Sequence, residues 1–219
     1  IQRHSFSVMP ISIWRPELDY ENSDYTIIST WEANFQNSSQ LRFQMFNRYV
    51  KLYDEFDPTR TDDAIPLPAD QNYYYTSFEV SFRSDQRKKV SYRINPSVGQ
   101  FFNGNKYSLE SSLSVRLQPY FSGSIQMNYD KIDLPDPYPD ASIWLIGPKI
   151  DITFTKNMFW STFFQYSTQR ENFSINTRFQ WRVAPLSDLF LVYNDNYSTT
   201  VFSPRFRSLN LKFTYWLNI

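Results

Sequence analysis

Side chains that could carry out catalysis are scarce in this sequence. The 219 residues include one histidine, His4, four glycines and no cysteine. A hydrolase of the Ser-His-acid type would have to use His4 as its base, and the lack of cysteine excludes a thiol nucleophile, a disulfide framework and a thiolate metal site. No glycine-rich phosphate-binding loop or nucleophile elbow occurs. We therefore expect a protein that is not an enzyme and that uses no metal or cofactor.

Charged and polar residues instead recur at every second position of apolar segments. Between 106 and 118, for example, Glu110 and Arg116 fall at even-numbered positions, whereas Leu109 and Leu113 fall at odd-numbered positions. Since successive side chains of a strand point to opposite faces, each such segment would have one apolar and one polar face. We predict that these polar-face residues line an interior: Glu79, Arg83, Arg93, Glu110, Arg116, Lys149, Asp151, Arg178, Arg182 and Lys212.

The excess of Arg and Lys on the predicted polar faces has two interpretations. Rings of basic side chains give a pore a preference for anions, whereas the fork of Arg also suits a hydrogen-bonded network that braces the interior. A buried Arg requires a partner, and by strand order Glu79 and Glu110 are the nearest carboxylates. Most other acids fall in the segments 15–24, 54–71 and 133–141, which could bind Ca²⁺ or form a solvated acidic surface.

Period-two alternation, the sequence signature of strands, extends along nearly the whole chain. No long segment has the 3.6-residue period of a helix, so the sequence predicts an all-β fold. The predicted strands number about twelve: 4–15, 25–36, 40–53, 72–84, 88–102, 106–118, 123–133, 142–155, 158–170, 172–183, 188–198 and 204–219.

The connections between these strands alternate between two kinds. One set is compact: 37–39, 84–88, 119–123, 155–157 and 184–188. In the other set 15–24, 54–71, 133–141 and 198–206 are longer and mostly acidic, and only 103–105 and 169–172 are short. Short periplasmic turns and longer surface loops are typical of outer-membrane barrels. This predicts a transmembrane antiparallel β-barrel with an even number of strands and with both ends of the segment in the periplasm.

The apolar faces could contact either lipid or the core of a soluble domain, because alternation alone does not distinguish them. Three features favour lipid. Aromatic residues such as Tyr74 and Phe82 lie near strand ends, the polar faces are rich in Ser, Asn, Gln and Arg, and the chain ends on an alternating aromatic strand. We interpret the apolar face of that strand as lipid-facing and as an assembly signal; it comprises Leu209, Leu211, Phe213, Tyr215, Leu217 and Ile219.

Composition restricts the class of protein further. Aromatic residues make up 19% of the chain, although its mean hydropathy is −0.53. No run approaches the roughly 18 apolar residues that a transmembrane helix needs. The formal net charge is zero, which argues against a nucleic-acid-binding protein.

The segment 178–198, "RFQWRVAPLSDLFLVYNDNYS", followed by the closing strand "LNLKFTYWLNI", resembles a known family. It is similar to the carboxyl end of the Bacteroidota family called domain of unknown function 5916. The residues that carry the likeness are Arg178, Trp181, Arg182, Pro185, Leu189 to Tyr193, Asn194 and Asp195. The resemblance implies a large outer-membrane barrel, whose full-length members carry an amino-terminal domain similar to carbohydrate-binding family nine. No such domain is encoded in residues 1–219.

We therefore expect residues 1–219 to form one outer-membrane barrel segment without a separate soluble domain. A strand pattern begins by about His4, which predicts the carboxyl-terminal part of a larger barrel. The expected role is transport, or anchoring of a surface or periplasmic complex. The expected partners are outer-membrane lipid and lipopolysaccharide, the barrel-assembly machinery and further outer-membrane or periplasmic subunits. The alternatives are a soluble all-β carbohydrate-binding domain and, more weakly, an outer-membrane hydrolase.

Overall fold

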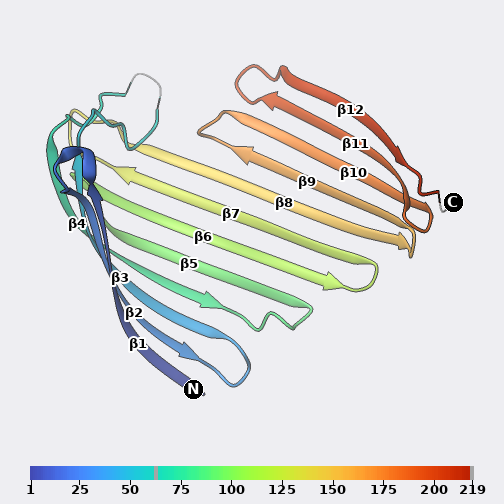
Figure 1. Cartoon of the computed structure of the whole chain (residues 1–219), viewed down its shortest axis with the longest axis horizontal. Helices are drawn as coiled ribbons and strands as arrows, with labels where there is room; N and C mark the ends of the chain where they lie inside the picture. Colours follow the sequence, from blue (N-terminus) through green and yellow to red (C-terminus); the bar gives the residue numbers. More distant parts are fainter. Residues whose placement is uncertain (62–63, 218–219) are drawn as a thin grey trace. The chain divides into compact units, whose positions relative to one another are not determined.

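The chain folds into a single antiparallel sheet whose strands follow one another in sequence order (Figure 1). The computed structural model describes residues 1–61 and 64–217. The 12 strands confirm the predicted all-β class. They are β1 (Arg3–Arg15), β2 (Glu21–Asn34), β3 (Gln40–Leu52), β4 (Gln71–Arg83), β5 (Val90–Phe101), β6 (Gly104–Leu117), β7 (Phe121–Asp133), β8 (Ala141–Thr155), β9 (Met158–Ser167), β10 (Asn172–Ala184), β11 (Ser187–Ser198) and β12 (Pro204–Thr214).

In the described part of the chain, helical structure is confined to one short 3-10 turn, η1 (Pro16–Leu18), between β1 and β2. Within residues 1–61 and 64–217, no helix is long and apolar enough to cross a membrane.

Two predicted strand boundaries were wrong by several residues. β2 begins at Glu21 rather than at 25, because its polar first turn pairs with β1: the Asn22 amide donates to the Ser12 hydroxyl at 2.5 Å and to the Ile13 carbonyl at 3.2 Å. The long connection predicted for 15–24 is therefore only 16–20. At the other end, β12 stops at Thr214. Tyr215 and Leu217 follow the strand, and Ile219 lies outside the described residues.

The edges of the sheet are β1 and β12. β1 pairs with β2 along its whole length, and β12 pairs with β11 from Thr214 to Pro204. Among the described residues no ladder joins β1 to β12, so the sheet is open. Each edge thus presents a row of backbone N–H and C=O groups that have no partner strand.

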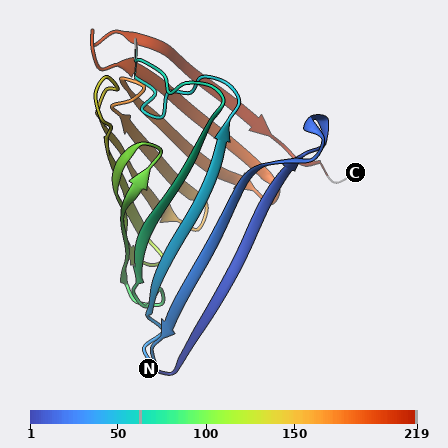
Figure 2. The same cartoon turned by 90° about the vertical axis from the view of Figure 1, so that its left-hand side faces the viewer.

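The chain divides into two compact units, and we describe each by itself. Unit 1 comprises residues 1–86, 92–111 and 128–143, and unit 2 comprises residues 87–91, 112–127 and 144–219. In unit 1, strands β1 to β4 run side by side (Figure 2), with residues 53–70 connecting β3 to β4.

The buried apolar residues of unit 1 lie mainly at the strand ends and in the loops. Leu67 is fully buried, and Ile132, Leu134 and Ala141 form a second small cluster. Phe56 and Leu67 bond to each other through both backbone amides, at 3.0 and 2.8 Å. We call residues 53–61 and 64–70 of this connection the loop cap.

Aromatic rings extend the loop cap onto the sheet. The ring of Phe102 lies 5.4 Å from that of Phe56, 5.3 Å from that of Tyr73 and 5.6 Å from that of Tyr75. The side chains at the middle of the strands, by contrast, have no second sheet or helix over them, and 39 large apolar residues are substantially exposed to solvent in the described chain, among them Phe78 and Leu113.

Candidate functional site

One face of unit 1 carries polar side chains that bond in pairs across neighbouring strands. The register aligns Glu32 with Arg42 and Arg42 with Ser81, and the guanidinium of Arg42 lies 2.9 Å from the Glu32 carboxylate. Further hydrogen bonds run between neighbouring strands on the same face: Gln44 to Thr30 at 3.1 Å, Arg48 to Ser77 at 2.9 Å and Ser81 to Asn95 at 2.7 Å. We call this surface the polar face.

A hollow of about 410 Å³ lies on the polar face of unit 1. Its lining combines three carboxylates, two cations and several aromatic rings: Glu79, Glu110, Asp130, Arg48, Lys106, Phe46, Tyr75 and Phe101. Lys106 lies 3.3 Å from Asp130, and the Ser108 hydroxyl donates to the same carboxylate at 2.5 Å. The hollow therefore offers charges of both signs together with flat apolar surfaces.

A second hollow, of about 290 Å³, lies on the polar face of unit 2. Asp151, Arg178 and Arg182 contribute to its lining. Lys149 lies 3.0 Å from Asp151, and Arg182 lies 3.5 Å from Asp188, which also accepts a hydrogen bond from Gln180 at 3.0 Å. Arg182 thus has a carboxylate partner, which the adjacent strand β11 supplies as Asp188, whereas Glu79 and Glu110 had been the nearest candidates by strand order.

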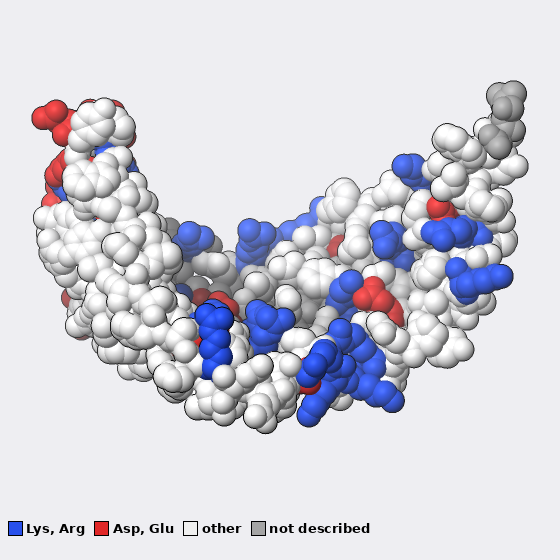
Figure 3. Space-filling model, turned by 60° about the horizontal axis from the view of Figure 1, so that its bottom comes forward, with Lys and Arg blue, Asp and Glu red and all other residues white. Residues whose placement is uncertain are grey.

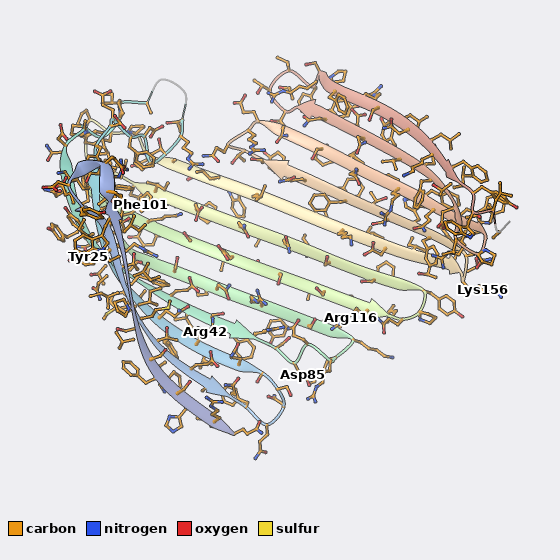
Figure 4. The ribbon with its side chains drawn as sticks, viewed as in Figure 1. Tyr25, Arg42, Asp85, Phe101, Arg116 and Lys156 are labelled. Carbon is orange, nitrogen blue, oxygen red and sulfur yellow. The ribbon has the colours of Figure 1, made fainter. Side chains whose placement is uncertain are left out.

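The remaining predicted polar-face residues lie on the same face but outside the two hollows. Arg83 and Arg93 are register partners on β4 and β5, so two cations stand directly opposite each other. Lys212 stands opposite Phe190 of β11. In Figure 4, Arg42 lies part-way along its strand in unit 1, whereas Asp85 lies in the turn at the strand ends away from Tyr25 and Phe101. Figure 3 shows more Lys and Arg than Asp and Glu on the face in view.

The opposite face of unit 1 is apolar and carries aromatic rows near both strand ends. Tyr25, Tyr49 and Tyr74 stand in register near the ends that carry the loop cap, with 5.3 Å between the first two ring centroids and 4.8 Å between the last two. At the other ends, the rings of Phe82 and Tyr92 lie 5.8 Å apart. From Tyr74 to Phe82 the strand advances by about 26 Å at roughly 3.3 Å per residue. At the tilt of about 40° that is usual in outer-membrane barrels this distance would span roughly 20 Å, compared with about 25 Å for the apolar band of such barrels.

Several polar side chains on the apolar face bond to one another. Thr76 donates to Asn47 at 2.8 Å in unit 1. In unit 2, the Trp160 indole donates to Thr162 at 2.7 Å, and Thr162 shares a 3.1 Å hydrogen bond with Thr177. Mutual pairing of this kind is what a surface without water requires.

A charged cluster on the apolar face of unit 2 was not predicted. Asp195, whose side chain is 1% exposed, accepts hydrogen bonds from Arg207 at 3.0 Å and from the Tyr193 hydroxyl at 2.5 Å. Arg207 also donates to the Tyr197 hydroxyl and lies over that ring. Parity could have revealed this cluster, since Asp195 lies an even number of residues from Leu191 and Tyr193, and Arg207 lies two residues from Leu209, which places them on the same face.

β12 is a strand with one apolar face, and its role as an assembly signal stays a prediction. Leu209, Leu211 and Phe213 stand opposite Tyr193, Leu191 and Leu189 on the apolar face. Beyond β12, the Trp216 amide donates to the buried Ser187 hydroxyl at 3.0 Å. This bond ties the end of the described chain to the turn between β10 and β11, where Leu186 adopts a left-handed φ of 58°.

Several acidic residues of the segments 15–24, 54–71 and 133–141 accept hydrogen bonds within the protein. Asp57 accepts the backbone amides of Thr59 at 2.8 Å and Thr61 at 3.0 Å inside the loop cap, and Asp140 accepts the Leu134 amide at 2.9 Å. Glu21 accepts a hydrogen bond from the Tyr53 hydroxyl at 3.2 Å; loss of hydration, followed by this bond, raises the pKa of Tyr53.

The structure also locates the candidates for a metal or catalytic role. Within residues 1–61 and 64–217, three His, Cys, Asp or Glu side chains nowhere converge as metal ligands would. Asp62 and Asp63 of the predicted acidic segment lie outside those residues. His4 stands in β1 opposite Ala33, next to the Phe6–Trp31 pair on the apolar face.

The chain matches no known family model, no curated protein and no solved structure. The resemblance of residues 178–219 to domain of unknown function 5916 therefore stays a prediction, and arguments about function rest on the geometry of the two faces.

Proposed function

We propose that this chain is a membrane-spanning part of a bacterial outer-membrane β-barrel that acts without enzymatic chemistry, as a passage for solutes or as a membrane anchor. The observation that carries the proposal is the contrast between the two faces. One bears exposed apolar side chains bounded by aromatic rows, and the other bears a hydrogen-bonded polar network. An outer-membrane barrel has this inverted arrangement, with lipid outside and a polar interior.

The proposed barrel is completed by strands that join the free edges of β1 and β12. Unpaired edges are unfavourable in a bilayer, because no water replaces the missing hydrogen bonds. The turns at 118–120, 156–157 and 185–186 would face the periplasm, and the loop cap would face the cell surface. Insertion would require the barrel-assembly machinery, with the β12 residues as its signal.

The simplest test asks whether the protein needs a membrane substitute to stay folded. We expect it to fold only in detergent or lipid, and to shift in mobility between unheated and boiled gel samples. A monodisperse, folded monomer in detergent-free buffer would refute the proposal. It would also favour the second candidate, a soluble carbohydrate-binding domain, for which the aromatic and carboxylate lining of the 410 Å³ hollow is suited.

Anion passage is the form of transport that the polar face supports best. Like charges directly opposite each other in a sheet are unfavourable, and an anion between Arg83 and Arg93 would relieve that repulsion. We expect Arg83→Gln with Arg93→Gln to lower the anion preference measured as a reversal potential across a planar bilayer. Lys131→Gln is the control, because Lys131 follows Asp130 and so points to the opposite face. An equal effect of the control would show that position on the polar face does not matter.

A further inference from the structure

The apolar face of unit 2 contains a second kind of site, a slot lined by aromatic rings at the strand ends. The slot has a volume of about 460 Å³ and is bounded by Tyr166, Phe173, Tyr197 and Phe202, with Ser198 and Thr199 at its margin. Tyr166 and Phe173 are register partners on β9 and β10. The slot therefore opens on the same face as the exposed residues Leu209 and Leu211, at the strand ends where residues 199–203 connect β11 to β12.

Two guanidinium groups flank the slot, each attached to one of its lining residues. Arg207 donates to the Tyr197 hydroxyl and is fixed by Asp195. Arg205 donates to the Ser198 hydroxyl at 3.4 Å and to the Arg170 carbonyl at 3.3 Å. A guanidinium has five N–H donors, and these contacts leave donors on both groups for a ligand. The Arg207 side chain is 52% exposed.

The charges around the slot favour an anion. The cations are Arg170, Arg205 and Arg207, and the acids are Asp195 and Glu171. Asp195 is buried beneath Arg207, and Glu171 accepts a hydrogen bond from Thr200 at 2.5 Å. Both carboxylates thus have partners within the protein, while the guanidinium groups face outward.

Phe202 has an unusual conformation for an aromatic residue. Its φ of 46° lies in the left-handed region, and its side chain is 83% exposed. A bulky residue in this region carries a steric cost, and no apolar contact within the protein recovers the full area of the ring. Contact with an external apolar group would offset that cost.

We propose that this slot binds one phosphate-bearing lipid, with an acyl chain between the aromatic rings and the phosphate on Arg205 and Arg207. Arg suits phosphate because its fork forms paired charge-assisted hydrogen bonds. The occupant is a lipid rather than a free anion because the guanidinium groups bond to Ser198 and Tyr197, two of the residues that line the aromatic slot. The inference rests on the proposed function, in which these strand ends reach the outer leaflet, where lipid A carries both phosphates and acyl chains.

The test measures binding of lipid A to the protein in a neutral detergent, with lipid A whose phosphates have been removed as the comparison. We expect Arg205→Gln and Arg207→Gln each to weaken binding of phosphorylated lipid A about tenfold to a hundredfold, and Phe202→Ala to weaken binding of both lipids. Arg178→Gln, which removes the same charge from the polar face, is the matched control. The dephosphorylated lipid should bind weakly to every variant.

Two further measurements keep the outcomes distinct. Asp195→Asn combined with Arg207→Gln removes the guanidinium without leaving a buried carboxylate unpaired, and this double variant replaces Arg207→Gln if the single variant does not fold. Mobility shifts on heating are recorded first: a protein that does not fold in detergent refutes the proposed function. A folded protein that binds both lipids equally, or that loses as much affinity through Arg178→Gln, refutes the lipid site alone.

Discussion

Replacement of Phe78 by Arg tests whether the apolar face contacts lipid. Phe78 stands on β4 midway between Tyr74 and Phe82, with its side chain 51% exposed. Four residues in each direction amount to about 13 Å of strand, so Phe78 would lie near the midplane of the bilayer. An Arg at the midplane of a barrel costs about 2–4 kcal/mol, falling to about 0–1 kcal/mol near the interfaces. Phe78→Arg should therefore be far more destabilising than Tyr74→Arg.

The assay is reversible urea unfolding in lipid vesicles, followed by tryptophan fluorescence. A loss of 2–4 kcal/mol corresponds to a change of roughly 30-fold to 900-fold in the unfolding equilibrium constant. Ser97→Arg is the control for the polar face, because Ser97 stands opposite Glu79, and we expect it to cost less than Phe78→Arg. If Phe78→Arg changes stability by less than about 0.5 kcal/mol, as at an ordinary water-exposed position, the lipid-facing interpretation is refuted.

Three other substitutions test the packing. Thr76→Val leaves the Asn47 amide without its 2.8 Å partner and should cost about 1–3 kcal/mol in lipid, measured by the same unfolding assay. Stability should recover in the Asn47→Leu, Thr76→Val double variant. Persistent destabilisation of the double variant would contradict this explanation. Leu67→Ala, at a fully buried position, should speed proteolysis within the loop cap while the heat-induced gel shift persists. Gly99→Ala would place a methyl group 2.3 Å from the backbone of β4 and should lower stability by at least about 1–3 kcal/mol. An unfolding curve like that of the unsubstituted protein would contradict this prediction.

The strands could be predicted because their alternation is regular and needs only local information. The strand predicted at 106–118 corresponds to β6 (Gly104–Leu117), and the strand predicted at 123–133 corresponds to β7 (Phe121–Asp133). The start of β2 was missed because Asn22 and Ser23 are typical of loops. Their side chains instead bond to β1, in the part of β2 that precedes the aromatic row at Tyr25. In that part of the strand polar groups are not confined to one face.

The sequence predicted which face of each strand carries the polar residues of the candidate site, but not which of these residues pair with each other. Parity assigns Arg182 to the polar face, yet the choice of Asp188 as its partner depends on the turn that sets the register of β10 and β11. Periodicity could not predict the loop cap, because Phe56 contacts Leu67 and Phe102 through pairings between residues distant in sequence. The Asp195–Arg207 pair contradicts the apolar pattern of its own strands, and such local exceptions are where functional sites are expected.

The sequential order of the strands has a consequence for how such a protein evolves. Each strand bonds only to the strands before and after it, so no connection crosses another. A β-hairpin could therefore be duplicated or deleted as a unit, with only the two flanking ladders re-formed. The number of strands would then change in steps of two, while the ends of the chain stay on the same side. Lineages that diverge in this way could alter the width of the sheet and still retain the register of every surviving hairpin.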